Sequence, residues 1–176
     1  MPETWLRPVE SDDVHVLARL LSHPDLVGRR GLDGDRPGRR SVASLEKAVA
    51  GFVDPQDGDA WVVDCDGVVG VARCGWWWDA HTPWAHVVID PIRWRQGHGA
   101  AAARLVADHL FTNTVALLVE YSIPSWDADA LSFADSLGGE RAGVRRRTGI
   151  RNGGYYDTVE FYLPRAIWEA HHAARG

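Results

Sequence analysis

Apolar side chains in the first third of the chain recur at intervals of three and four residues, which is the spacing of one face of a helix. This spacing predicts a helix over residues 11–23, opened by a Ser-Asp-Asp capping run, and a second helix over residues 41–52. A short extended segment at residues 5–8 precedes them. The stretch 28–40 is rich in glycine, arginine, aspartate and proline, so we expect a loop that acts as a lid over substrate.

From residue 61 onward the spacing of apolar residues changes to two, as expected of strands. Residues 61–65 and 68–78 are predicted to form the two strands of a hairpin, because Asp66-Gly67 is a sequence favoured in two-residue turns. A third strand, an antiparallel neighbour of this hairpin, is predicted over residues 84–90.

The second half of the chain alternates between these two spacings. A helix begins near Gln96, a strand follows over residues 115–121, and a helix over residues 126–137 ends at two glycines. Strands over residues 141–150 and 155–163 form a closing hairpin before a short final helix. This order predicts an α/β (α+β) fold, with a mixed, mostly antiparallel sheet of about six to seven strands flanked by about four helices.

The composition adds limits to this picture. The 176 residues, of which 45% are hydrophobic, suffice for a single domain over residues 1–176. A net charge of -5 argues against nucleic-acid binding as the main task, and the basic run 145–147 is expected to be a solvated strand edge. No apolar run reaches the roughly 18 residues of a membrane span, and the eight histidines show no metal-ligand spacing. We therefore expect a cytoplasmic protein without a metal, a nucleic-acid partner or a membrane partner.

The segment HVVIDPIRWRQGHGAAAARLVADHLF joins a strand to a helix through an arginine-rich corner. Gly97 and Gly99 lie at the N-terminus of this helix, so its first N–H groups can hold a phosphate, with Arg93 and Arg95 beside it. The absence of a following Lys-Ser or Lys-Thr excludes a P-loop. The glycines also match a dinucleotide-binding fingerprint, but residues 91–96 intervene after the strand and the chain closes with a hairpin, which disfavours that fold.

At WRQGHG this segment resembles the pyrophosphate-binding signature of the GNAT acyltransferase superfamily. LRPVESDDVHVLARLL and WDADALSFADSLGGERAGVRRRTGIRNGGYYDTVEFYL are similar to the opening and closing elements of the branch that acetylates protein N-termini, such as those of ribosomal proteins. The resemblance implies acetyl-CoA as co-substrate, its pantetheine along the strand and its pyrophosphate in the loop. The cofactor-binding residues that it implies are Val87, Val88 and Ile89 in the strand, Trp94, Arg95, Gln96, Gly97, His98, Gly99 and Ala100 in the loop, and Asp127 before the later helix.

Several residues depart from the pattern of that family. Trp94 stands where the family has arginine or glutamine, and Asp127 replaces the asparagine that usually opens the last helix. Ala134 occupies the position of a tyrosine that protonates the leaving thiolate in many members, and Gly139 replaces a common phenylalanine. The resemblance therefore supports the cofactor site better than it supports the usual acid and base.

Acyl transfer to an amine needs a base and a proton for the departing sulfur. His86 is the first candidate for the base because imidazole titrates near neutral pH, and a packing role is its alternative. Glu120, at the end of the next strand, is the second candidate, with a surface or capping role as its alternative. Potential proton donors are Tyr121, Ser122 and Ser132, and we assign Ser132 to the site.

Tryptophans are concentrated in residues 76–78 and at Trp84. Alternate residues of a strand share a face, so three adjacent indoles cannot all enter one pocket. Trp76, Trp78 and Trp84 are assigned to the acceptor site, with core packing as the alternative.

These observations predict an N-acetyltransferase that moves an acetyl group from acetyl-CoA to an amine by direct attack on the thioester. The acceptor is a small molecule or a peptide or protein N-terminus. A non-catalytic acyl-CoA-binding or regulatory domain of the same fold is the alternative, followed by a nicotinamide-dependent oxidoreductase. A homodimer is left open.

Overall fold

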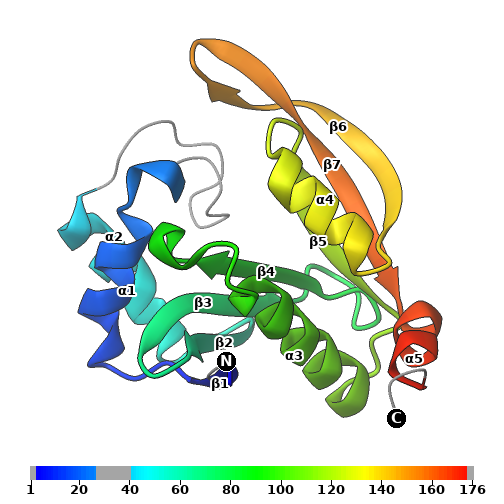
Figure 1. Ribbon diagram of the computed structural model, residues 1–176, viewed down its shortest axis with the longest axis horizontal. Coiled ribbons are helices and arrows are strands. Elements are labelled where there is room, and N and C mark those ends of the chain that lie inside the picture. The colour runs from blue at the N-terminus through cyan, green and yellow to red at the C-terminus, as the bar shows by residue number, and fades with distance from the viewer. Residues whose placement is uncertain (1–2, 27–40, 174–176) are drawn as a thin grey trace. The chain divides into compact units, whose positions relative to one another are not determined.

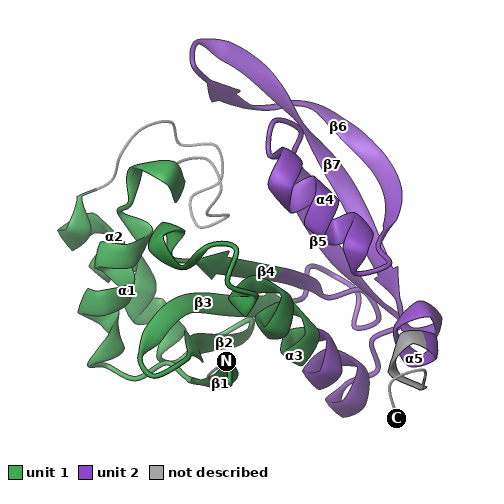
Figure 2. Cartoon of the chain, viewed as in Figure 1, with its two compact units in different colours: residues 1–75, 86–106 green, residues 76–85, 107–176 purple. Residues whose placement is uncertain are grey.

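The computed structural model describes residues 3–26 and 41–173 (Figure 1), and the lid expected at residues 28–40 lies outside them. The chain forms two compact units, each made of two segments (Figure 2). Unit 1 consists of Met1–Gly75 and His86–Val106, and unit 2 consists of Trp76–Ala85 and Ala107–Gly176.

The described strands form a seven-stranded sheet in the order β1-β2-β3-β4-β5-β7-β6. They are β1 Trp5–Pro8, β2 Gly58–Asp64, β3 Val68–Gly75, β4 Trp84–Ile89, β5 Leu118–Pro124, β6 Glu140–Arg151 and β7 Gly154–Pro164. The pairs β1–β2, β2–β3, β5–β7 and β6–β7 are antiparallel, whereas β4 pairs with β5 in parallel, with Trp84 opposite Glu120. The prediction of a mixed, mostly antiparallel sheet is confirmed.

Five α-helices accompany these strands in the described part of the chain. They are α1 Asp13–Leu21, α2 Val42–Val49, α3 His98–Asn113, α4 Ala128–Ser136 and α5 Arg165–Ala173, with 3-10 turns η1 Pro24–Leu26, η2 Ala50–Phe52 and η3 Pro91–Arg93. The first two helices follow the apolar spacing read from the sequence. Leu17 and Leu21 of α1 and Leu45 of α2 are fully buried with Val62 of β2 and Val71 of β3 in the core of unit 1.

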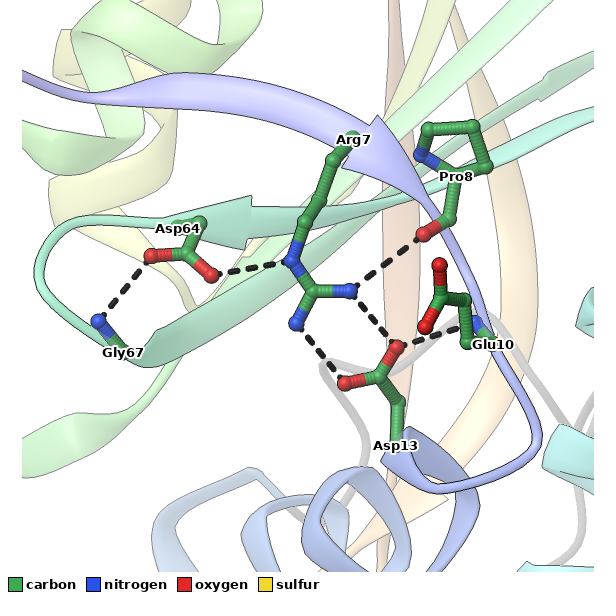
Figure 3. Close-up of polar contacts among 6 residues, drawn as sticks. All are labelled: Arg7, Pro8, Glu10, Asp13, Asp64 and Gly67. Carbon is green, nitrogen blue, oxygen red and sulfur yellow. Dashed lines mark hydrogen bonds and ion pairs between the residues drawn. The ribbon is translucent and has the colours of Figure 1, made fainter.

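Arg7 in β1 forms the polar contacts that hold the start of unit 1 together (Figure 3). Its Nη1 and Nη2 donate to the two carboxylate oxygens of Asp13 at 2.7 and 2.8 Å, and its Nε donates to Asp64 at 3.0 Å. The N–H groups of Glu10 and Gly67 donate to Asp13 and Asp64 at 2.9 and 3.0 Å, respectively. Arg7 therefore links β1 to the start of α1 and to the β2–β3 turn, and its guanidinium lowers the pKa of Asp13.

In unit 2, the part of the sheet formed by β5, β7 and β6 has one apolar face and one polar face. Phe161 and Val159 of β7 pack with Ala134 of α4 on one face, and Figure 1 shows α4 lying along β5 and β7 there. Residues at the alternate positions, including Ser122 and Glu160, which are opposite each other in register, lie on the other face. That face is polar, and it carries part of the candidate site.

The predicted strand over residues 68–78 is wrong in its last three residues. β3 ends at Gly75 because Gly75 is opposite Gly58, the first residue of β2, and the tryptophans 76–78 therefore follow the strand instead of continuing it. The strand predicted over 115–121 also lies slightly later, as β5 at Leu118–Pro124.

Candidate active site

The loop after β4 is anchored by Trp94. Its indole Nε1 donates to the carbonyl oxygen of Ile89 at 2.9 Å, and its ring packs against the core cluster of unit 1 that contains Val88. Asp90 opens the intervening 3-10 turn by accepting from the N–H of Ile92 at 3.1 Å. Trp94 therefore has a structural role in this loop: its hydrogen bond connects the loop to the end of β4.

The backbone between this anchor and α3 adopts the conformation of a turn. Arg95 and Gly97 have positive φ values of 62° and 88°, and no heavy atom lies within 4 Å of where a Cβ on Gly97 would stand. α3 begins at His98, and its first hydrogen bond runs from the N–H of Ala101 to the carbonyl of Gly97 at 3.0 Å. The N–H groups before Ala101 have no helical acceptor, so an anion can bind there, aided by the helix dipole.

The side chains of this loop divide into structural and exposed groups. His98 is buried, and its Nδ1 lies 2.9 Å from Thr4 Oγ1, so it can offer a phosphate only its backbone N–H. Gln96 donates to the carbonyl of Ile92 at 3.4 Å. Arg93 and Arg95 are exposed. The loop therefore has what a diphosphate needs: an open glycine corner, a helix N-terminus and two guanidinium groups.

The cofactor strand expected from the sequence is β4. Val88 and Ile89 are buried and Val87 is half-buried. His86, in the same strand, lies near Arg73 of β3, and burial together with that positive charge lowers the pKa of His86 to about 4. The imidazole is therefore neutral throughout the physiological pH range, as a base must be, but it is a weak base.

Unit 2 contains a carboxylate pair, Glu120 of β5 and Glu160 of β7, which lie near enough for the charge of Glu160 to raise the pKa of Glu120. Ser122 Oγ donates to Glu160 at 2.6 Å, and Arg145 of β6 donates both to Glu160 and, at 3.3 Å, to Ser122. Burial first, and the negative charge of Glu160 second, raise the pKa of Glu120. The structure thus brings Glu120 into a site that can accept a proton or hold a cation.

The sequence analysis did not select Glu160 or Arg145 as site residues. Its prediction that residues 145–147 lie on a solvated strand edge is confirmed, because all three are exposed on the edge strand β6. Glu160 stands between two buried apolar residues, Val159 and Phe161, and that isolated charge in an apolar strand is the signal that marks it. Nothing local links it to Glu120, since β5 and β7 are distant in the sequence.

The other predicted site residues lie in different settings. Asp127 is buried and caps α4 by accepting from the N–H of Ala130 at 3.2 Å, whereas Ser132 is exposed on α4. Trp78 is 90% exposed and Trp76 is half-buried. Trp84 is opposite Glu120 in register, so of the three tryptophans it is the one next to the carboxylate pair.

The sequence profile of the acetyltransferase (GNAT) domain matches residues 4–139. The chain belongs to the GNAT acetyltransferase family. It is accordingly an acetyl-CoA-dependent acyltransferase, as the sequence analysis expected. A search of curated proteins gave no match.

Solved GNAT structures share the fold. Spermidine N-acetyltransferase from Vibrio cholerae, in complex with CoA and spermine, superposes with a TM-score of 0.79 at 16% identity, over 94% of this chain and 98% of that one. A GNAT-family acetyltransferase from Bacillus anthracis gives 0.78 at 14% identity, over 93% and 96%. A GCN5-related N-acetyltransferase from Brucella melitensis gives 0.76 at 17% identity, over 95% and 78%.

No helix in the described part of this GNAT has both the length and the apolar character needed to cross a membrane. No three His, Cys, Asp or Glu side chains within the described ranges form a metal-binding group.

Proposed function

We propose that this GNAT transfers the acetyl group of acetyl-CoA to a primary amine of a cationic small molecule, and that Glu120 is the base. The observation that carries the proposal is the carboxylate pair of Glu120 and Glu160. It lies beside Trp84, which is opposite Glu120 across the β4–β5 pairing. Carboxylates and an indole are the groups that attract an ammonium ion.

The loop of unit 1 fits the donor substrate. The N–H groups of residues 97–100 would accept the diphosphate of acetyl-CoA, with Arg93 and Arg95 contributing charge. The pantetheine would follow β4 along Val87, Val88 and Ile89, as the resemblance to the family implies. Asp127 already caps α4, so we expect it to orient that helix for the site.

Glu120 is a better base than His86 because the surroundings of the two side chains shift their pKa values in opposite directions. The pKa of Glu120 is raised from an ordinary value of 4.5, whereas that of His86 is lowered to about 4, so the usual order of their basicities is reversed. Proton transfer to a base becomes more favourable as its pKa rises towards the working pH. We therefore assign proton removal from the attacking amine to Glu120 and give His86, which lies in the donor strand β4, no role as the base.

The charges favour a cationic acceptor. The carboxyl groups of Glu120 and Glu160 face the guanidinium of Arg145, which is paired with Glu160, and Trp84, with Trp77 at a ring-centroid distance of 6.0 Å, adds aromatic surface. The spermidine acetyltransferase of Vibrio cholerae acts on such an amine. A peptide N-terminus, as in the ribosomal-protein branch, carries one ammonium and is the competing acceptor.

The test is a steady-state assay of thiol release from acetyl-CoA with spermidine, simple primary amines and short peptides. Glu120→Gln should lower kcat/KM for the best amine by roughly 100-fold or more, while the exposed Glu140→Gln serves as the matched control. Because the base must be deprotonated, kcat/KM of the wild type should fall as the pH drops through the raised pKa of Glu120, and this limb should vanish in Glu120→Gln.

Three results would contradict the proposal. Retention of the acidic limb in Glu120→Gln would move the base elsewhere, and a preference for peptides over every small amine would favour the N-terminal branch. Tight CoA binding without thiol release across the panel would indicate a non-catalytic acyl-CoA-binding domain.

A further inference from the structure

A guanidinium group of the protein itself is bound to one of the two carboxylates of the candidate acceptor site. Arg145 of β6 donates from Nε to one carboxylate oxygen of Glu160 and, at 3.3 Å, from Nη2 to Ser122. Ser122 Oγ donates to the other oxygen of Glu160 at 2.6 Å. The Glu160 side chain is 12% exposed, whereas the Arg145 side chain is 62% exposed. Glu160 is therefore a cation-binding position, and the cation that it holds is on a side chain that solvent reaches.

The second carboxyl group, Glu120, is in a different electrostatic position. The charge of Arg145 lowers the pKa of Glu120, but burial and the charge of Glu160 outweigh that effect. When Glu120 is deprotonated, as a base must be, two carboxylates and one guanidinium leave a single net negative charge. Because Arg145 is paired with Glu160, that charge is centred on Glu120, where it can attract one ammonium group.

The backbone on the β6 side leaves room for a ligand near Glu160. Gly143 of β6 is opposite Glu160 in register, and residues directly opposite each other on neighbouring strands have adjacent side-chain positions. No heavy atom lies within 4 Å of where a Cβ on Gly143 would stand. Charge, and not bulk, therefore decides whether a second cation can bind at Glu160.

We propose that Arg145 is a specificity-determining residue: by occupying Glu160 it makes the enzyme prefer amines with one ammonium group over diamines and polyamines. This inference rests on the proposed function. The ammonium group of a monoamine binds at Glu120 beside Trp84, whereas a second ammonium on the same molecule meets a guanidinium, and like charges repel. The indoles of Trp84 and Trp77 offer apolar surface for the rest of the molecule. All of these residues belong to unit 2 (Figure 2), and the acceptor class that they favour is a monoamine with an apolar or aromatic body.

The ion pair between Arg145 and Glu160 is not needed to hold β6 in place. β6 pairs with β7 along most of its length through the backbone. An ion pair with a strongly exposed partner also adds little to stability. Removal of the Arg145 charge should therefore change which amines are accepted while the protein remains folded.

The test compares hexylamine with hexamethylenediamine, which have the same carbon chain but one and two ammonium groups. Thiol release from acetyl-CoA gives kcat/KM for each amine with the wild type, Arg145→Gln, Arg145→Lys and Arg146→Gln. Arg145→Lys keeps the charge. Arg146→Gln is the matched control, because Arg146 is the next residue of β6, is 83% exposed and pairs with Asp157 at 3.7 Å instead.

The wild type should prefer hexylamine. Arg145→Gln should raise the ratio of kcat/KM for the diamine to that for hexylamine by about tenfold, the effect of one solvent-screened charge contact. Arg145→Lys and Arg146→Gln should leave this ratio within about twofold of the wild type. Loss of the Arg145 charge should also move the acidic limb of the pH profile to higher pH in Arg145→Gln, since that charge lowers the pKa of Glu120.

Four outcomes would overturn the inference. A wild type that prefers the diamine contradicts it without any variant. An unchanged ratio in Arg145→Gln, with a Tm close to that of the wild type, shows that Arg145 does not set the selectivity, although the proposed function stands. Equal shifts in Arg145→Gln and Arg146→Gln indicate general surface charge instead of the pair with Glu160. If the wild type releases no thiol with any amine, the proposed function fails and this inference fails with it.

Discussion

Arg7 offers a direct measure of how unit 1 is held together. Arg7→Met keeps the length and apolar stem of the side chain but removes all three N–H groups that donate to Asp13 and Asp64. The side chains of Asp13 and Asp64 are only 9% and 10% exposed. The variant therefore leaves two poorly solvated carboxylates that keep only their backbone donors, Glu10 and Gly67.

The size of the effect follows from that burial. Removing one partner of a buried ion pair typically costs about 3–5 kcal/mol. The Arg7 side chain is 32% exposed, so solvent screens part of the interaction, and we expect a loss of about 2–3 kcal/mol in the free energy of unfolding at pH 7. Arg19→Met, which changes an exposed arginine of α1, should cost less than about 0.5 kcal/mol.

The effect should depend on pH with a defined sign. Arg7 lowers the pKa of Asp13 in the folded protein, so this contribution is complete above the unfolded value of about 3.9 and is lost as the pH falls through the lower folded value. Urea unfolding at pH 7 and at about pH 3 should therefore show a smaller difference between wild type and Arg7→Met at the acidic pH. An undiminished difference there, or one below about 0.5 kcal/mol at pH 7, would refute this account of Arg7.

Two other substitutions test the donor site. Trp94→Phe keeps the packing of the ring but loses the hydrogen bond to Ile89. Calorimetry should therefore show CoA binding weakened roughly fivefold, which is a loss of about 1 kcal/mol in binding free energy. An unchanged Kd would mean that the loop does not depend on this hydrogen bond. His86→Gln should lower kcat by less than about tenfold, because His86 is a weak base. The acidic limb of the pH profile should remain in place. A loss of about 100-fold in kcat with intact folding would instead identify His86 as the base.

Much of the fold is predictable because the sequence patterns that indicate its helices and turns lie within short segments. The helical spacing before residue 23 predicts α1, and Asp66-Gly67 predicts the turn between β2 and β3, as found. The end of β3 is not predictable in this way, since it depends on where β2 begins to pair with it. Gly58 and Gly75 are far apart in the sequence, and the run of tryptophans favours a strand on propensity alone.

The same distinction applies to the candidate site. The glycine corner could be recognised because the turn and the start of α3 lie within one short segment. The carboxylate pair could not, because Glu120 meets Glu160 only through the register of β5 with β7. Arg145 lies on the exposed edge strand β6, as predicted, but its ion pair with Glu160 could not be predicted because it depends on the register of β6 with β7.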